Sequence, residues 1–425
     1  MSSKDVLLYF GTEEAKVTAG QDADCQVKLK KEDCQIYNIS DPEELKTACE
    51  SEGNTYIFMD AASSVSTNQA TSANNYQLTN ITSGTKIIRG NGGKLEQSTD
   101  NNKTLTTEGG QIKLFNVTGS STILEINNLT FNCKDPYIVG TSSSTIDGAT
   151  VILKQCLING ILMSNEGTSL IYVKSGGKLI LEDCTFYGNE STGTITTTDL
   201  SYTECIRIEN GADVEVISCN FEGNGNAYNI VNAAAINNSG VCHIIDTTLK
   251  SNKAQHGGAI INRNAGILKI EDSTFDSNGN DNGYYEKRGG AIFIQSGIVQ
   301  IKNGTFTSNT TFGENGSSGK ESIQKLGGGA ISIKTGSLVL QNTKFENNSV
   351  TLTSSNDAYG YGGAILIEQS DASLFLKDAN GSAIDIESYI NNYMSGNTTE
   401  KSNAGANIYC NGGTINGTVY TQAWE

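Results

Sequence analysis

The two residues of this sequence that come nearest to a catalytic arrangement are Asp246 and Asp272. Each follows an alternating apolar segment at the same position of a repeated motif, so stacked repeats would bring the two carboxylates about 5 Å apart. A pair of carboxylates can supply the acid and the base that cleave a glycosidic bond. The alternative is a structural ladder of Asp and Asn at a corner, because Asn303 and Asn342 occupy the same position of later repeats.

Histidine and cysteine residues add no further catalytic or metal-binding pattern. His243 and His256 have neither triad nor metal-ligand spacing, and the ten cysteines contain no Cys-x-x-Cys pair. We therefore predict neither a bound metal nor a cofactor.

Two groups of cysteines are candidates for disulfides. Cys156 and Cys184 stand at equivalent positions of neighbouring repeats, at a separation compatible with a disulfide, and buried free thiols are the equal alternative. Cys25, Cys34 and Cys49 lie close together in the sequence, which makes them the better candidates in an oxidising compartment.

The elements that would position these residues are internal repeats. A large apolar residue followed three positions later by Asn recurs along the chain, and a small residue precedes it by two positions. From Phe131 to Phe345, seven steps cover 214 residues, or about 31 residues per step, which suits one turn of a solenoid better than a domain. The pairs are Phe186/Asn189, Phe221/Asn224, Leu249/Asn252, Phe275/Asn278, Phe306/Asn309 and Phe345/Asn348.

Each repeat contains two strand-like segments at a fixed offset. Apolar residues alternate with polar ones before each Phe, which is typical of a β-strand. A second segment begins Gly-Gly-Ala-Ile, at 257–260, 289–292, 328–331 and 362–365. The connection from Asn to the next Gly-Gly varies from 5 to 19 residues, so all length variation falls at one corner. Stacked parallel coils tolerate such variation, because a loop at one corner leaves the strand register unchanged.

Three regions follow from this pattern. Residues 1–38 are a strand-like extension that could mediate assembly with a neighbouring chain. Residues 39–60 combine a short helix, with Pro42 at its start and Leu45 and Ala48 on one face, with a first strand that together would cap the open end of the coil. Residues 61–425 are predicted to form the coil.

The two motifs resemble the repeat of chlamydial polymorphic outer-membrane proteins and related adhesin-like surface proteins. The resemblance covers about 186–365, while the helix and strand at 39–60 resemble the pectin-lyase-like superfamily. These resemblances imply an all-β fold, a right-handed single-stranded parallel β-helix with a short N-terminal capping helix. They also imply an extracellular or cell-surface protein that acts in adhesion or self-assembly, as a homo-oligomer or filament.

A second function of a different class is open on the same fold. Enzymes similar to pectate lyases use a carboxylate cluster that binds Ca²⁺ and a basic residue, and those similar to polygalacturonases use paired Asp. A polysaccharide lyase or hydrolase is therefore the alternative to a non-catalytic adhesin or structural subunit.

The variable corner is where we expect binding, because insertions there project together on one face. Exposed aromatic side chains on these loops could stack on carbohydrate or anchor a protein of a host or cell surface, or they could fold back over the coil. The candidates are Tyr284, Tyr285, Arg288, Phe312, Tyr359 and Tyr361.

Charge and composition limit the partners further. A net charge of −17 disfavours nucleic acid and anionic membranes, which bind clustered Lys and Arg. No apolar run approaches the length of a membrane-spanning helix. Fourteen Asn-x-Ser/Thr sequons leave glycosylation open. They include Asn116, Asn128, Asn189, Asn309 and Asn397.

Overall fold

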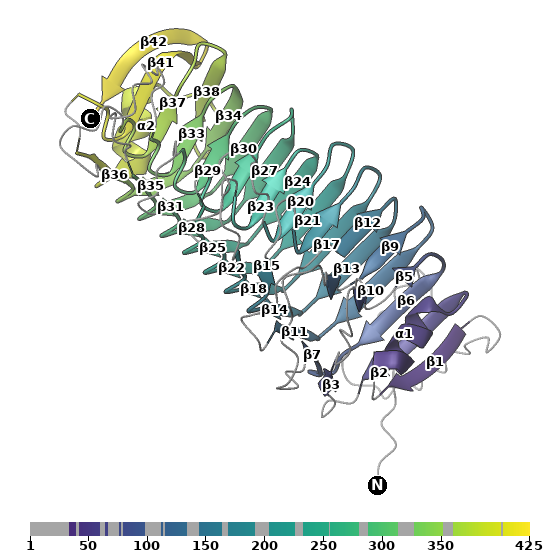
Figure 1. Ribbon diagram of the computed structural model, residues 1–425. Helices are drawn as coiled ribbons and strands as arrows, with labels where there is room; N and C mark the ends of the chain where they lie inside the picture. Colours follow the sequence, from purple (N-terminus) through teal and green to yellow (C-terminus); the bar gives the residue numbers. More distant parts are fainter. Residues whose placement is uncertain are drawn as a thin grey trace, which may run out of the picture.

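The chain was examined as a computed structural model, in which strands stack along one axis as the coils of a right-handed parallel β-helix (Figure 1). The fold class predicted from the repeats is confirmed. The structure describes residues 34–39, 42–59, 64–66, 76–77, 80–97, 112–113, 115–133, 144–163, 169–191, 204–225, 233–254, 256–279, 288–312, 327–351, 360–400 and 403–425.

Each coil contributes a strand to three faces, which we name the long-strand, short-strand and third faces. The long-strand face contains β1 (Cys34–Ile39), β2 (Asn54–Met59), β6 (Thr85–Arg89), β10 (Ile123–Asn127), β13 (Thr150–Lys154), β17 (Lys178–Glu182), β21 (Asp213–Ile217), β24 (Val241–Ile245), β27 (Ile267–Glu271), β30 (Ile298–Lys302), β34 (Gly336–Gln341) and β38 (Ala372–Lys377). The short-strand face contains β5 (Asn80–Ile81), β9 (Asn116–Thr118), β12 (Ser144–Asp147), β16 (Ile171–Val173), β20 (Ile206–Ile208), β23 (Ile236–Asn238), β26 (Ile260–Asn262), β29 (Ile292–Ile294), β33 (Ile331–Ile333), β37 (Ile365–Ile367) and β41 (Ile408–Ile415).

The third face and the short accessory pairs complete the coils. The third face contains β3 (Ser64–Ser66), β7 (Lys94–Gln97), β11 (Thr130–Cys133), β14 (Leu157–Asn159), β18 (Thr185–Tyr187), β22 (Asn220–Glu222), β25 (Thr248–Lys250), β28 (Thr274–Asp276), β31 (Thr305–Thr307), β35 (Lys344–Glu346) and β39 (Met394–Ser395). Smaller parallel pairings join β4 (Tyr76–Gln77) to β8 (Ile112–Lys113), β15 (Leu162–Met163) to β19 (Glu190–Ser191), and β32 (Thr310–Phe312) through β36 (Ser349–Thr351) to β40 (Thr398–Thr399).

The apolar residue of each repeat forms one column inside the third face. Phe275 pairs with Phe306, and Phe306 with Phe345, in the parallel register. Their rings stack with centroids 4.5 and 4.9 Å apart and planes within 10° of parallel. The prediction that these residues share one core is therefore confirmed. Offset stacking adds to the free energy of burying each ring.

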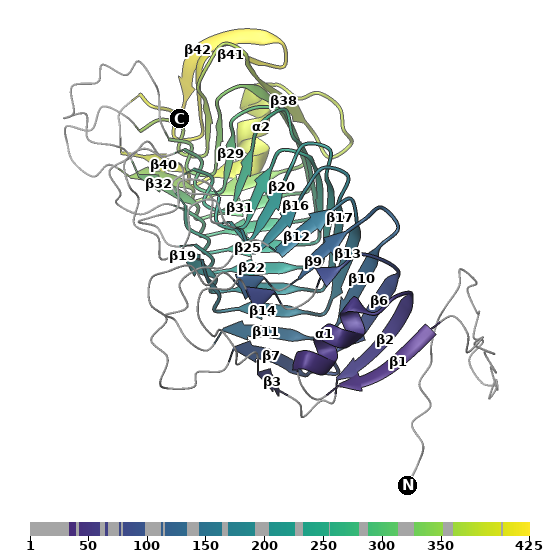
Figure 2. The same cartoon turned by 45° about the vertical axis from the view of Figure 1, so that its right-hand side comes forward.

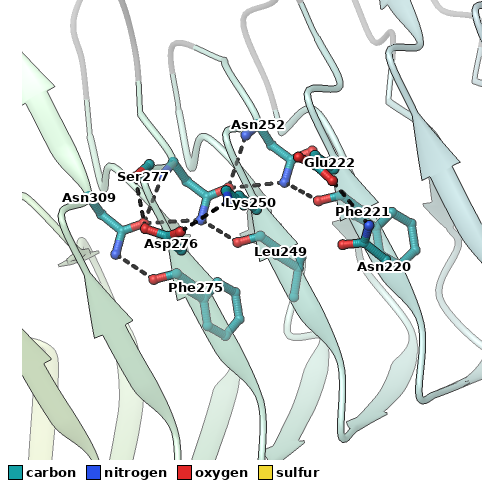
Figure 3. A network of polar contacts seen from close by, with 11 residues as sticks. Asn220, Phe221, Glu222, Leu249, Lys250, Asn252, Phe275, Asp276, Ser277 and Asn309 are labelled. Atoms are coloured by element: carbon teal, nitrogen blue, oxygen red, sulfur yellow. Dashed lines mark hydrogen bonds and ion pairs between the residues drawn. The ribbon is translucent and has the colours of Figure 1, made fainter.

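The Asn that follows each apolar residue forms a buried ladder (Figure 3). Asn278, for example, donates from Nδ2 to Leu249 O on the coil before and to Asn309 Oδ1 on the coil after, at 2.8 and 3.0 Å. Its Oδ1 accepts from the backbone N–H and the Nδ2 of Asn252. All four hydrogen-bonding positions of the amide are used, which is what allows a polar side chain to be buried at this corner.

The chain turns at the residue before each Asn of the ladder. This residue has a positive φ, as at Ser277 and Ser308, both with φ of 55°. The left-handed residue turns the chain, and the Asn after it then points its amide into the stack.

The Gly-Gly-Ala-Ile motif marks the start of the short strands, where backbone segments come very close. Gly289 has a φ of +61°, which an L-residue with a side chain rarely adopts. A Cβ at Gly290 would lie 2.0 Å from Gly329 O on the next coil. Both glycines are therefore required by geometry.

Helix α1 and strands β1 and β2 form the N-terminal end of the coil. Helix α1 (Pro42–Glu50) buries Leu45 and Ala48 against the first strands. Strand β1 precedes the helix and pairs in parallel with β2, so the end of the segment 1–38 belongs to the stack. Lys86 connects strand β6 to the turn after α1. Its buried ammonium donates to Ser51 O and Gly53 O, at 2.5 and 2.7 Å.

The last coil carries a second helix and a hairpin. In helix α2 (Ile386–Tyr393), the buried Tyr389 hydroxyl donates to Thr343 O at 2.8 Å. Strand β42 (Thr418–Trp424) pairs antiparallel with β41 and packs Trp424 on the core. Figure 1 shows the α1 and β42 ends at opposite ends of the rod.

Replacing Asn278 by Ala should lower the free energy of unfolding. The change removes the acceptor of the buried Asn252 N–H, at about 1–3 kcal/mol, and also removes the side-chain hydrogen bonds that Asn278 makes to Leu249 O and Asn309 Oδ1. Urea unfolding followed by circular dichroism would measure the loss. Asn220→Ala is the matched control, because that partly exposed amide bonds only to Glu222 two residues away. Equal effects of the two changes would contradict a stabilising ladder.

Candidate functional site

Between β23 and β37, the outward side of the short-strand face is buried. In these strands the first residue points into the main core, while the middle residue points away from it and belongs to separate apolar clusters. From β23 to β37, the middle residues are at most 3% exposed. They are Asn237, Ile261, Phe293, Ser332 and Leu366. A second buried layer therefore lies outside the coil on this face. Figure 2 labels several strands of this face, among them β12, β16, β20 and β29.

A charged pair is buried in this layer. The Arg288 guanidinium donates from Nε to both carboxylate oxygens of Glu368, at 3.1 and 3.0 Å, and both side chains are at most 4% exposed. Ser332 donates to the same carboxylate at 2.5 Å, and Phe293 lies 5.6 Å from the guanidinium. We call these four residues the Arg288 cluster. Arg288 and Glu368 are 80 residues apart, so the cluster joins three successive coils.

Burial dominates the electrostatics of the acidic member. It raises the pKa of Glu368, while the charge of Arg288 and the hydrogen bonds from Ser332 and Arg288 act in the opposite direction. A buried carboxylate held by an arginine and a serine can bind and position the chain, because both of its oxygens are already occupied.

A second buried acid lies on an earlier coil. Glu204 is completely buried, and Asn237 donates from Nδ2 to its Oε1 at 3.3 Å. Within the described residues, Glu204 Oε2 and Asn237 Oδ1 have no hydrogen-bond partner. Burial raises the pKa of Glu204 to about 7, and the charges of Arg207 and Arg263 only partly offset this.

The two predicted catalytic candidates lie elsewhere, at the corner after the long strands. Asp246 and Asp272 are exposed and have φ values of 48° and 52°, which turn the chain. Asp246 accepts from Ser218 Oγ at 3.0 Å, and Asp272 accepts from Asn303 Nδ2 at 2.7 Å. Asn342 in turn donates to Asn303 at 2.8 Å. This is the corner ladder that we set against the catalytic interpretation.

Two predicted binding residues are not exposed on a loop. Arg288 is buried in its ion pair, and Tyr361 is buried against Leu366, Ala404 and the ring of Tyr409, whose centroid is 4.5 Å away. Of the two alternatives, projection from a loop and folding back over the coil, these two side chains follow the second. Their chain segments pass over the apolar outward row, and covering it removes water from that row.

The other predicted binding residues are only partly placed. Phe312, at the end of β32, is half-buried. Tyr284, Tyr285 and Tyr359 lie outside the described residues, so their role stays a prediction.

The histidines occupy separate places on the coil. His243 lies on the long-strand face, 3.2 Å from Glu271. His256 precedes a short strand, with its ring centroid 5.4 Å from that of Phe293. No group of three or more His, Cys, Asp or Glu side chains could hold a metal ion within the described ranges.

Cys156 and Cys184 are buried free thiols, and Cys219 continues their row. The backbone N–H of Cys184 donates to Cys219 Sγ at 3.4 Å. The same contact recurs on the next coils, where the N–H of Cys219 donates to Thr247 Oγ1 and the N–H of Thr247 donates to Ser273 Oγ. Cys49 is also free, and burial raises its pKa to about 12. Cys25 and the side chain of Cys34 lie outside the described part of the chain.

The ladder also bears on glycosylation. Asn189, Asn309 and Asn397 belong to it, with amides that are buried and hydrogen-bonded. A glycan on any of them is incompatible with the folded coil. Asn128 is exposed at a left-handed corner, and Asn116 is partly buried.

Sequence reasoning missed Glu204, Asn237 and Glu368. A weak signal was present, because Asn237 and Ser332 place a polar residue in the middle of a strand with Ile at its start. The partners of these residues come from other coils, which the sequence pattern does not specify.

Comparison of the chain with models of protein families, with curated proteins and with solved structures gave no match. Neither α1 nor α2, the helices of the described residues, is long and apolar enough to cross a membrane.

Replacing Glu204 by Gln should change the pH dependence of stability. A folded-state pKa of about 7, against an ordinary value of 4.5, means that the native protein holds a proton which the unfolded chain releases between these values. The wild type should therefore lose roughly 3 kcal/mol relative to E204Q as pH rises from 4.5 to 7. Urea unfolding at several pH values measures this difference, and a constant difference would rule out the shifted carboxyl.

Breaking the Arg288–Glu368 pair should cost more than removing it. Arg288→Met leaves a buried carboxylate and should lower the free energy of unfolding by about 3–5 kcal/mol. The double variant R288M/E368M removes both charges and should recover most of this loss. The partly exposed pair Lys154–Glu182, at 3.1 Å, is the control, because its disruption should cost about 0–1 kcal/mol. A double variant as unstable as R288M would contradict the interpretation.

Proposed function

We propose that this protein is a non-catalytic β-helical scaffold that works outside the cell or on its surface, in adhesion or as a structural subunit. The observation that carries the proposal is the engagement of Asp246 and Asp272 in a corner ladder. Their backbone forms the turn, and each carboxylate accepts a hydrogen bond from the neighbouring coil. Carboxylates used in this way stabilise the stack, whereas hydrolysis needs one to move a proton and another to activate water.

The arrangement of the remaining polar groups supports the same function. The buried Asn amides hydrogen-bond to one another in the ladder, and the buried Arg288 and Glu368 side chains form an ion pair. Such a coil is a stiff rod whose connections at one corner can vary in length without disturbing the strands. Rigid repeats that carry variable loops suit recognition and assembly.

The resemblance of the Gly-Gly-Ala-Ile and Phe-x-x-Asn motifs to chlamydial polymorphic outer-membrane proteins and related surface adhesins supports a role at the cell surface. A homo-oligomer or filament is part of this proposal, with residues 1–38 as the assembly segment. Carbohydrate or a protein of a cell surface is the partner that we expect for the loops.

A polysaccharide panel tests the function. The protein should be retained on one or more polysaccharides and should produce no new chain ends, measured by a reducing-end assay and by absorbance of unsaturated products. Retention without cleavage supports adhesion, and the absence of both, with oligomers on sizing, supports a structural subunit. Cleavage that is lost in D246N/D272N would contradict the proposal, because Asn fits the same left-handed corner and keeps the ladder.

A further inference from the structure

A shallow depression of about 200 Å³ lies on the long-strand face, towards the C-terminal end of the rod. It spans β27, β30, β34 and β38, which are neighbours in the parallel register (Figure 1). Two rows of outward side chains line it. The first row is Lys269, Gln300 and Val339, and the second row is Glu271, Lys302, Gln341 and Lys377.

The depression has an excess of positive charge. It contains Lys269, Lys302 and Lys377 against the single acid Glu271, which lies 3.2 Å from His243 and 3.9 Å from Lys302. Within the described residues, neither Lys269 nor Lys377 has a carboxylate within ion-pair distance. This excess occurs in a chain of net charge −17.

Several lysines on earlier coils are paired with carboxylates. Lys154 lies 3.1 Å from Glu182, and Lys178 lies 3.1 Å from Glu215, both on earlier strands of the same face. Lys174, in the turn after β16, lies 3.2 Å from Asp147. Lys269 and Lys377 differ from these in having their charges available to a ligand, while Lys302 shares the single carboxylate of Glu271 with His243.

The remaining lining groups suit a sugar chain. Val339 provides an apolar base, and Phe375 stands next to it in the same row with 38% of its surface exposed. An aromatic or aliphatic surface packs against the face of a sugar ring. The amides of Gln300 and Gln341 can exchange hydrogen bonds with hydroxyl groups.

We propose that this depression binds an extended polysaccharide that carries carboxylate or sulfate groups. Lys302 and Lys377 lie in one row two coils apart, which separates their positions by about 10 Å along the rod. A polymer lying across the strands can meet both with anionic groups while its rings contact Val339 and Phe375. The inference rests on the proposed function as a scaffold that binds without cleavage, and it places a binding surface apart from the variable loops.

The experiment measures binding of the full chain to immobilised polygalacturonate, dextran sulfate, neutral dextran and poly-glutamate. We expect binding to polygalacturonate or dextran sulfate and none to neutral dextran. The variant K269Q/K302Q/K377Q should bind about tenfold or more weakly, because three charge contacts are lost. K154Q/K174Q/K178Q changes the net charge equally and should retain wild-type affinity. F375A should weaken binding to the polysaccharide without changing its dependence on salt.

Four results would overturn the site. They are equal losses in the two triple variants, equal binding of poly-glutamate and the acidic polysaccharides, no effect of F375A on binding, and no binding of any acidic polymer by the wild type. Circular dichroism confirms that these surface variants fold. The proposed function has a separate test, because new chain ends in the polysaccharide panel would contradict it. If the protein binds no acidic polymer but binds another glycan without cleavage, only the proposed site is contradicted.

Discussion

The structure depends on the hydrogen bonds that each coil makes to the coils before and after it. These bonds fix neighbouring strands about 4.8 Å apart and in register, so each side chain lies over its equivalent on the next coil. Apolar side chains satisfy this constraint by stacking, as Phe275, Phe306 and Phe345 do. A polar side chain satisfies it inside only if it can both donate to and accept from a copy of itself. Asn can do this, and the ladder around Asn278 uses every position of its amide.

The same constraint explains why a charged side chain is paired on the short-strand face but can be unpaired on the long-strand face. A charged side chain cannot stack on an identical one in the interior without repulsion, so a repeated row of charges can lie only on the outside. Lys86 is a single inward charge, and its ammonium donates to Ser51 O and Gly53 O at the N-terminal end. On the short-strand face the outward row is covered, and Arg288 therefore needs Glu368 two coils away. On the long-strand face the row is open to water, and Lys269 and Lys377 can stand without a carboxylate. Exposure, rather than the sequence repeat, decides which charges must be paired.

The parts of the structure that repeat could be predicted from the sequence, and those that join distant coils could not. The Phe column and the alternating strands have a regular signal, and the first helix has Pro42 with Leu45 and Ala48 on one face. Whether Arg288 and Tyr361 fold back over the coil could not be decided from the sequence, because the residues that bury them come from other coils. The lysines of the depression were missed for a similar reason, since loops of unequal length separate residues that the register brings together.

The position of Glu204 shows how the coil changes along its length. It stands two residues before Ile206, and the register aligns it with Ala234 and then with Gly258, the second glycine of the first Gly-Gly-Ala-Ile motif. A Cβ at Gly258 would lie 2.3 Å from Gly290 O, so the later coils exclude any side chain there. The earlier coil admits a whole glutamate and buries it. The Gly-Gly-Ala-Ile motif therefore begins at the coil where neighbouring backbone segments leave no room for a side chain. Glu204 occupies the equivalent position two coils earlier. A buried carboxyl group is stable there only when it is protonated or paired. The stability of this part of the coil therefore depends on pH.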